Sequence, residues 1–348
     1  MTAVPPPGTY LPDAWFIAAK SGALGKRPLA VTLQGHPLVL FRAKDGTATA
    51  LSDRCPHRNV PLSLGRVRDG ELECAYHGWR FDGAGQCTAV PGLPDGAQVS
   101  LKSRCAEAWA TREAQGYVWV YSTPSVTPST EPFQFPHVDE AGYATVHRDY
   151  VVDATLHAAV ENVLDVPHTA YLHGGLFRTE EKRNVIDVLV RRHDTWAEAQ
   201  FHGEPRPTGL IGKLLAPGGG VVEHTDRFLL PSIAQVEYRL GPVSHVVATS
   251  AMTPESDTRT RIYAVVTFRL PLPGWLVKPV VMPIASRIFA QDAVMLARQT
   301  DTVKRFGGEK FTSTELDVLG PQVTRLLKQA AAKEPPGEPH EHRVQMKT

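Results

Sequence analysis

Two sets of side chains in this sequence could each bind a metal. The first set offers one cysteine and one histidine in each of two short segments, Cys55-Pro56-His57 and Cys74-Ala75-Tyr76-His77. The second set follows later in the chain and comprises Asp165, His168 and His173. Thiolates and imidazoles bind iron and zinc, and a pair of imidazoles suits a mononuclear iron. The sequence therefore contains candidate ligands for two separate metal centres.

The first set could form a tetrahedral zinc site, because thiolate and imidazole ligands both suit zinc. A zinc finger, however, pairs cysteine with cysteine in one segment and histidine with histidine in another. Here each loop offers one cysteine and one histidine. The two loops together can therefore bind two irons that have different ligands. A Rieske 2Fe-2S centre has this asymmetry, with two thiolates on one iron and two imidazoles on the other. We favour such a centre at Cys55, His57, Cys74 and His77, with zinc as the alternative.

Helical spacing relates the members of the second set. Asn162, Asp165 and His168 are spaced by three, so on one helix they would share a face and could form hydrogen bonds in sequence. His173 would point away from His168 on an ideal helix of about 3.6 residues per turn. Both histidines can reach one metal only if the helix is bulged or ends between them, and the glycine pair at 174–175 favours an ending.

A carboxylate could complete the second set. Asp292 lies in an otherwise apolar stretch, where an unpaired carboxylate would be costly unless it met a metal or a cation. Asp301 is followed three and four residues later by a lysine and an arginine, which predicts that it forms an exposed ion pair. We expect Asp292 to be the third ligand, with Asp301 and Glu309 as alternatives. Two imidazoles and one carboxylate leave open positions on iron for O2 and a substrate.

Three motifs resemble one known family. Residues 55–77 with the following Gly78-Trp79-Arg80-Phe81-Asp82-Gly83 resemble the Rieske domain of the Rieske non-haem iron oxygenases. Residues 161–173 are similar to that family's catalytic-domain pattern E-N-x-x-D-x-x-H-x-x-x-x-H. Gln291-Asp292, with Gln299 further on, resembles the segment that supplies the family's third iron ligand. The motifs occur in the family order, and the resemblance covers residues 11–325.

The resemblance implies an α+β protein with two domains. An all-β Rieske domain is expected over residues 1–125, and a helix-grip (START-like) catalytic domain with an antiparallel sheet and helices over residues 126–332. Short apolar runs at 29–33, 37–41 and 117–121 predict strands of the first domain. A Pro-, Ser- and Thr-rich stretch at 122–136 predicts the linker. Residues 333–348 predict a disordered tail.

The apolar patterns of the second domain predict its strands and helices. Strands are expected around residues 185–190, 228–230, 233–239, 245–252 and 261–270. One helix is expected to carry Asp165, and another, beginning after Pro283, to carry Asp292. The preceding apolar residues 275–284 are interrupted by a lysine and two prolines and predict a buried or cavity-lining segment, with peripheral membrane contact as the minor alternative.

By resemblance, the protein is a terminal oxygenase that receives electrons from a separate NAD(P)H-dependent reductase or ferredoxin. The cofactors would be a Rieske 2Fe-2S cluster and a mononuclear Fe(II), with O2 as co-substrate. The expected reaction is hydroxylation or oxidative demethylation of a largely hydrophobic or aromatic small molecule, as in the phthalate dioxygenase and vanillate O-demethylase branch. A cis-dihydroxylating dioxygenase and a non-catalytic Rieske electron carrier are the alternatives.

The family also implies an assembly. Its members form head-to-tail trimers in which the aspartate matching Asp165 bridges to a Rieske histidine of the neighbouring subunit. By resemblance, the partner in a homotrimer of this chain is His77. We expect Asp165 and Asn162 to be catalytic residues.

Composition narrows the possible partners. The chain has 37 Lys plus Arg against 36 Asp plus Glu, so its overall charge gives no reason to expect nucleic acid binding. No eighteen-residue apolar run and no export signal are recognisable, which predicts a cytoplasmic protein without a transmembrane segment. Five arginines near the cluster loops suit an acidic electron donor, although a solvated surface is the alternative: Arg54, Arg58, Arg66, Arg68 and Arg80.

Overall fold

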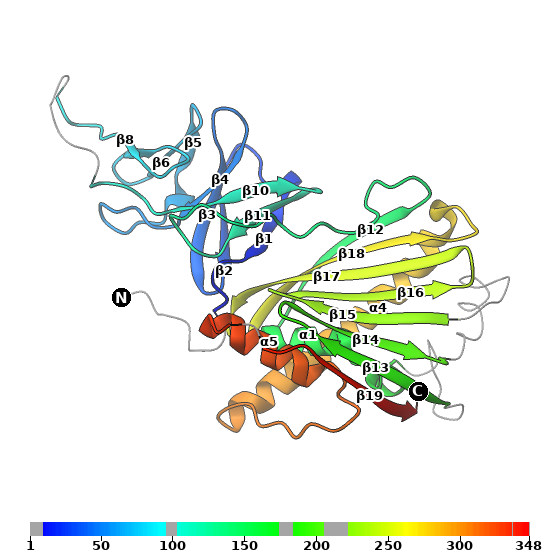
Figure 1. Cartoon of the computed structure of the whole chain (residues 1–348). Coiled ribbons are helices and arrows are strands. Elements are labelled where there is room, and N and C mark those ends of the chain that lie inside the picture. The colour runs from blue at the N-terminus through cyan, green and yellow to red at the C-terminus, as the bar shows by residue number, and fades with distance from the viewer. Residues whose placement is uncertain (1–9, 95–102, 174–183, 205–221, 336, 348) are drawn as a thin grey trace. The chain divides into compact units, whose positions relative to one another are not determined.

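The computed structural model describes residues 10–94, 103–173, 184–204, 222–335 and 337–347. The chain divides into two compact units, Tyr10–Gln134 and a second unit from Phe135 onward (Figure 1). The boundary lies inside the Pro-, Ser- and Thr-rich stretch that predicted a linker. It follows Gln134 rather than residue 125, because the chain after the last strand of the first unit still contacts that unit: the Trp15 indole donates a hydrogen bond to the carbonyl of Thr130.

The first unit is all-β and contains three antiparallel sheets. The first has the order β1 (Trp15–Lys20), β11 (Tyr117–Tyr121) and β10 (Thr111–Ala114). The second has the order β2 (Leu29–Leu33), β3 (His36–Arg42), β4 (Ala48–Ser52) and β9 (Ala108–Trp109). The third has the order β5 (Arg66–Arg68), β6 (Glu71–Glu73), β7 (Arg80–Phe81) and β8 (Cys87–Ala89). The strands predicted at residues 29–33, 37–41 and 117–121 are confirmed.

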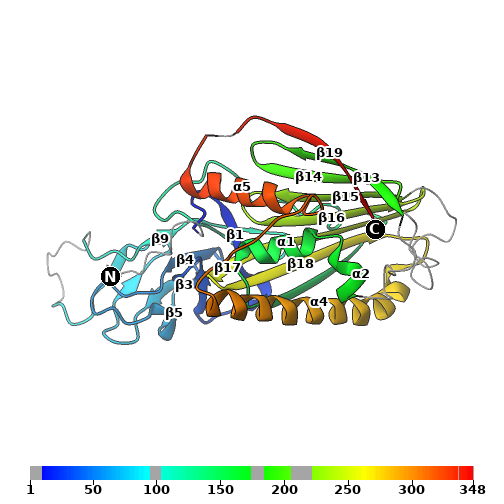
Figure 2. The same cartoon turned by 90° about the horizontal axis from the view of Figure 1, so that it is seen from below.

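The second unit is built on one antiparallel sheet of eight strands. The strand order is β12 (Ala144–Val152), β18 (Arg259–Arg269), β17 (Ser244–Ser256), β16 (Ile233–Leu240), β15 (Val222–Leu229), β14 (Trp196–His202), β13 (Val185–Arg192) and β19 (His340–Lys347). Among the described residues, four helices accompany it: α1 (Leu156–Leu164), α2 (His168–Leu172), α4 (Gly274–Arg305) and α5 (Gly320–Ala332). Helices α1, α4 and α5 lie on one face of the sheet (Figure 2), which confirms the expected helix-grip arrangement.

Helix α4 begins earlier than the sequence indicated. We expected it after Pro283, yet it starts at Gly274 and runs through both Pro279 and Pro283. The two prolines are four residues apart, so they lie on the same side of the helix, and both are exposed. Each lacks an N–H, but the carbonyl groups left without that donor can be hydrated on this side. The prolines are therefore compatible with one long helix that carries Asp292.

The C-terminal segment is not the disordered tail that we expected. Residues 340–347 form strand β19, which pairs with β13 along its whole length, from Arg192 opposite His340 to Val185 opposite Lys347 (Figure 1). The segment is polar, and most of its side chains are exposed. It is held mainly by backbone hydrogen bonds at the edge of the sheet, which composition does not reveal.

A buried cluster of charged residues lies within the sheet. The His224 ring stacks between the rings of Phe201 and Tyr238, with centroid distances of 4.4 and 4.0 Å. Its Nδ1 lies 2.7 Å from Oε2 of Glu204, and its Nε2 lies 2.8 Å from Oδ1 of Asp226. Burial by itself lowers the pKa of His224, but the two carboxylates outweigh burial and raise this pKa to about 9. The imidazole is therefore charged at neutral pH.

Within the described ranges, none of the helices combines the length and the apolar character needed to cross a bilayer.

Candidate metal sites

Two loops of the first unit bring together the first candidate ligand set, and both loops close in the same way. In the first, the N–H of Cys55 donates to the carbonyl of Val60, and the N–H of Asn59 donates back to the carbonyl of Cys55, both at 2.9 Å. The second loop repeats these two bonds at 2.8 and 3.0 Å among Cys74, Trp79 and Gly78. Each loop is thus a tight knuckle that begins at a cysteine.

A left-handed residue makes each knuckle possible. Asn59 has φ 60° and Gly78 has φ 67°, and each is the fourth residue after its cysteine. Asparagine and glycine are the residues that adopt this conformation most readily. A Cβ on Gly78 would also lie 3.1 Å from Cγ of Pro91. These constraints explain why the second loop turns sharply after His77.

The two cysteines of this set are deeply buried and close to each other. Cys55 is 2% exposed and Cys74 is 3% exposed. Burial, together with the neighbouring Cys74 thiol, raises the pKa of Cys55 to about 11. Two thiols in such a place ionise readily only beside a cation, so the pair suits a metal or a cluster.

The two imidazoles of this set also adjoin. The rings of His57 and His77 are 4.6 Å apart between centroids. His57 stacks on Trp79 at 4.7 Å with an interplanar angle of 2°, and its Nδ1 is buried without a hydrogen-bond partner. A buried ring nitrogen without a partner is costly, which fits a metal ligand. The ring of Tyr76 contacts that of His77, and the Tyr76 side chain is itself exposed.

The second ligand set forms where a helix breaks. Helix α1 ends at Leu164, and α2 begins at His168. Pro167 lies between them, and a proline both lacks an N–H and disfavours helical geometry in the preceding residue. Helix α2 is short and ends at Leu172, just before His173, which confirms an ending between the two histidines. The glycines at 174–175 lie outside the described residues.

This break corrects the reason that we gave for the position of Asp165. Asp165 and His168 do not share one helical face, because Asp165 caps α1 in an extended conformation and His168 starts α2. The turn nevertheless leaves Oδ2 of Asp165 3.4 Å from Nδ1 of His168, a long distance for a hydrogen bond. Burial lowers the pKa of His168, but the carboxylates of Asp165 and Asp292 raise it above its usual value.

Asp292 on α4 completes the second set. The ligand atoms of His168, His173 and Asp292 lie within 4.8 Å of one another. Oδ1 of Asp292 is 3.1 Å from Nε2 of His173 and 3.7 Å from Nε2 of His168. Among the residues that the structure describes, no other group of three such side chains converges in this way. The alternative carboxylate Glu309 instead accepts a hydrogen bond from Thr155.

The environment of this group suits a metal ion. The side chain of His173 is 1% exposed, and its Nε2 is buried without a hydrogen-bond partner. Its other ring nitrogen, Nδ1, lies 3.0 Å from Oε1 of Gln291. With Nδ1 donating to that amide oxygen, Nε2 keeps a free lone pair beside Asp292. Two imidazoles and a carboxylate are a donor set that binds Fe(II) and leaves positions open.

Two amides hold the candidate ligands. Asn162 Nδ2 donates to Oδ1 of Asp292 at 3.5 Å. Its partner is therefore a candidate ligand on another helix, and not Asp165 or His168 on a shared helix face as we expected. The contact between Gln291 and His173 was not predicted. The position of Gln291 next to Asp292 was its only signal in the sequence, because the partner His173 lies far away along the chain.

Comparison with known proteins matches two parts of the chain to known domain families. Residues 14–103 match the model of the Rieske [2Fe-2S] domain, and residues 152–333 match that of the vanillate O-demethylase oxygenase C-terminal domain. The dicamba O-demethylase oxygenase component of Stenotrophomonas maltophilia is 36% identical over 183 residues, 53% of this chain and 52% of that protein. The vanillate O-demethylase oxygenase subunit of a Pseudomonas species is 24% identical over 92% of this chain and 95% of that subunit.

These matches differ in extent. The chain spans about half the length of several curated relatives, such as 51% of the chloroplast Protein TIC 55 of Pisum sativum. The crystal structure of dicamba monooxygenase bound to dicamba aligns with a TM-score of 0.74 at 24% identity, over 93% of this chain and 98% of that one. This likeness shows a shared fold. Since the oxygenase domain model covers more than half of the chain and follows a Rieske domain, the chain belongs to the vanillate O-demethylase type of Rieske non-haem iron oxygenases.

Proposed function

We propose that this chain is the terminal oxygenase component of a multicomponent Rieske system. The observation that carries the proposal is the convergence of His168, His173 and Asp292 around the unpartnered Nε2 of His173. The same chain supplies two buried thiols and two adjoining imidazoles in its first unit. When bound, a 2Fe-2S cluster passes single electrons, and Fe(II) with open positions activates O2.

The residues have distinct proposed roles. Cys55, His57, Cys74 and His77 hold the cluster, and His168, His173 and Asp292 hold the iron. Gln291 fixes the tautomer of His173, and Asn162 orients the carboxylate of Asp292 through its amide. Trp79 covers one face of the His57 ring and excludes water there.

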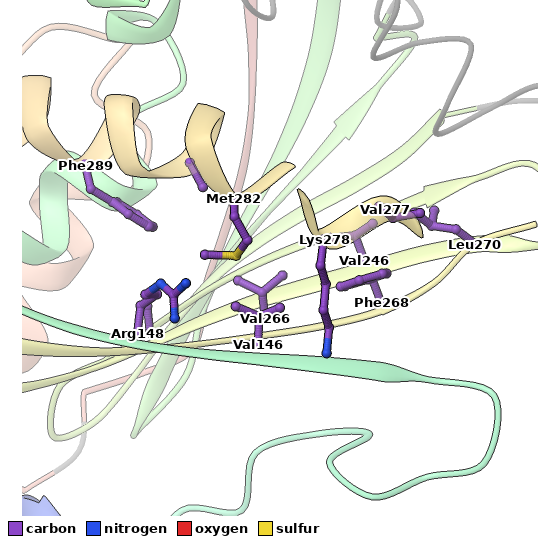
Figure 3. Close-up of a pocket in the computed structure, with 12 residues that line it drawn as sticks. Val146, Arg148, Val246, Val266, Phe268, Leu270, Val277, Lys278, Met282 and Phe289 are labelled. Atoms are coloured by element: carbon purple, nitrogen blue, oxygen red, sulfur yellow. The ribbon is translucent and has the colours of Figure 1, made fainter. Parts of the chain in front are cut away.

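An apolar cavity supports a hydrophobic or aromatic substrate. The cavity lies between α4 and strands β12, β17 and β18, and Figure 3 shows Phe289, Met282 and Val277 of α4 over Val146 and Val266 of the sheet. The lining of this cavity includes none of the three candidate iron ligands. It lies close to them along α4, because Phe289 precedes Asp292 by three residues, and Phe289 contacts Tyr150 at 4.8 Å between ring centroids. Burial and the nearby Asp292 carboxylate both raise the pKa of Tyr150, so its hydroxyl stays neutral.

The names of the relatives favour oxidative demethylation, since two are O-demethylase oxygenase components. Product mass distinguishes the reactions. Demethylation removes one carbon as formaldehyde, hydroxylation adds one oxygen atom, and cis-dihydroxylation adds both atoms of O2. The test is to supply the iron-loaded protein with a surrogate reductase and a panel of aromatic methyl ethers, and to measure O2 uptake together with product mass. Uptake without any product from the panel would argue against this substrate class.

We further propose a separate reductase or ferredoxin as electron donor. Of the five arginines near the cluster loops, Arg66, Arg68 and Arg80 pair with carboxylates of Glu71 and Glu73. Docking of an acidic donor would therefore use Arg54, just before the first knuckle, and Arg58, within it, because both are exposed. None of the four cysteines, all of which lie in the described part of the chain, forms a disulfide, which suits the cytoplasm.

We propose a head-to-tail homotrimer in which Asp165 meets His77 of a neighbouring subunit. The Asp165 side chain is one-third exposed, and His77 is exposed, so both are accessible to a neighbour. Closed rings are the usual outcome of head-to-tail contacts. Analytical ultracentrifugation tests the assembly, and iron analysis separates an oxygenase from an electron carrier. Three irons per chain are expected for the oxygenase and two for the carrier, since only the oxygenase holds a mononuclear iron.

A further inference from the structure

The apolar cavity between α4 and the sheet has two charged residues in its wall, and both are cations. Helix α4 contributes residues spaced by four, three and four, which lie on one side of a helix: Lys278, Met282, Ala285 and Phe289. Strand β12 contributes Val146 and Arg148, which point to the same face of the sheet because they are two residues apart. Among the described residues that line the cavity, all are apolar except Arg148 and Lys278.

Arg148 and Lys278 have no acidic partner among the described residues. Nη1 of Arg148 donates to the carbonyl of His147 at 3.1 Å, and neither cation forms an ion pair with a carboxylate of the described ranges. The neighbouring Asp149 points to the other face of β12, where its Oδ2 lies 3.8 Å from Nη1 of Arg261. Arg148 is exposed and Lys278 is half-buried. Both charges are therefore available to a bound anion.

The two cations lie away from the end of the cavity that is nearest to the candidate iron ligands. Phe289 marks that end, because it is one helical turn from Asp292. Lys278 precedes Asp292 by fourteen residues, which is roughly 21 Å along a helix. Arg148 lies on β12, the edge strand of the sheet, and Figure 3 shows Arg148 and Lys278 on either side of Val146. A charged group held there remains close to solvent at the sheet edge.

We propose that the apolar cavity binds an apolar molecule with one carboxylate, which Arg148 and Lys278 hold at the end opposite to the group that is oxidised. This inference rests on the proposed oxygenase function and narrows its substrate class to apolar acids. The guanidinium of Arg148 presents paired N–H groups that match a carboxylate, and the ammonium of Lys278 adds a second charge. The apolar wall suits the rest of the molecule. A divalent phosphate suits it less, because it loses more hydration beside apolar groups.

The test measures equilibrium binding by isothermal calorimetry to the protein loaded with its cluster and iron, without O2 so that no turnover occurs. Three ligands of similar size differ in charge: 4-methoxyphenylacetate, its uncharged amide and the cationic 4-methoxyphenethylamine. We expect the carboxylate to bind about tenfold or more tightly than the amide, and the amine to bind most weakly. The preference for the carboxylate should decrease as the salt concentration rises, because both cations are partly exposed.

Variants assign the preference to the two residues. Arg148→Gln and Lys278→Met each remove one charge but keep a side chain of similar length. Each should weaken binding of 4-methoxyphenylacetate about threefold to tenfold and leave the affinity for the amide within about twofold. The double variant Arg148→Gln/Lys278→Glu should bind the amine more tightly than the carboxylate. Arg287→Gln is the matched control, because Arg287 is exposed on α4 and, nine residues after Lys278, points to the opposite side of the helix.

Equal affinity of the wild-type protein for the carboxylate and the amide overturns the proposal, and so does an unchanged preference in the double variant. An equal loss of affinity in Arg287→Gln would mean a general effect of charge and would also overturn it.

Turnover with O2 and a surrogate reductase separates this inference from the proposed function. Preferred binding of 4-methoxyphenylacetate without its oxidation would contradict the proposed demethylation but support the assignment of the cavity. The isomer 2-methoxyphenylacetate places the methoxy group beside the carboxylate side chain, so it should yield less demethylated product than the 4-methoxy isomer. Equal product from both isomers would overturn the placement of the carboxylate opposite to the oxidised group.

Discussion

Gln291→Leu should weaken binding of the mononuclear iron without affecting the 2Fe-2S cluster. The amide of Gln291 accepts from Nδ1 of His173 at 3.0 Å, and this ring is almost completely buried. Leucine leaves the N–H without an acceptor, which costs about 1–3 kcal/mol. The ring can then carry its proton on Nε2 instead, the atom that faces Asp292. Loss of such a supporting contact typically lowers metal affinity about 10–100-fold.

The assay is an anaerobic Fe(II) titration against a coloured chelator, with the visible absorption of the cluster as internal reference. Gln299→Leu is the matched control, because Gln299 lies on the same helix and, together with His168, lines a second cavity that is distinct from the apolar one. Gln291→Glu keeps an acceptor at the same place and should restore most of the affinity. Wild-type iron affinity in Gln291→Leu would refute the reasoning, and so would an equal loss in Gln299→Leu.

Three further predictions concern the ligands, electron transfer and pH. His168→Ala and Asp292→Ala should each remove the mononuclear iron and abolish product formation but leave the visible absorption of the cluster intact. Iron analysis and visible spectroscopy measure these effects. A full iron content in Asp292→Ala would exclude this carboxylate as a ligand. Asp165→Asn should keep both metals and the trimer but lose most turnover, and single-turnover reoxidation of the reduced cluster at the wild-type rate would contradict this. The pKa of His224 is raised from 6.5 to about 9 in the folded protein, so its contribution to stability is complete below pH 6.5 and is lost as the pH rises through 9. Urea unfolding of the second unit should therefore lose at most about 3 kcal/mol between pH 6.5 and 9.5 in the wild type, whereas a His224→Gln variant should show little of this dependence.

The sequence predicted best what depends on local spacing. Each knuckle is completed within six residues of its cysteine, so the pattern of Cys55, His57, Cys74 and His77 indicated a shared cluster site before any fold was known. The strands of the first unit were also predictable, because short continuous runs of apolar residues mark buried strands, as at β3 and β11. Asp292 could be singled out because it interrupts an apolar stretch.

Contacts between distant segments were harder to predict. The position of Asp165 depends on the break at Pro167, and the spacing by three suggested one continuous helix instead. The contact between Gln291 and His173 joins residues 118 positions apart. Strand β19 has the composition of a disordered tail, and only the free edge of β13 gives it a structure. Sequence patterns describe each segment by itself. The position of Asp165, the Gln291–His173 contact and strand β19 depend instead on contacts with other segments of the chain.

The place of β19 in the sheet has a consequence for biosynthesis. Strand β13 pairs with β14 on one side, but its other edge is covered only by β19, and Arg191 of β13 meets Glu341 of β19 across 150 residues of sequence. At about 5–20 residues per second, a nascent chain would leave that edge unpaired for roughly 8–30 s. An open edge can pair with another chain during that time. The yield of folded protein should therefore depend on how quickly the ribosome completes the segment from α5 to β19.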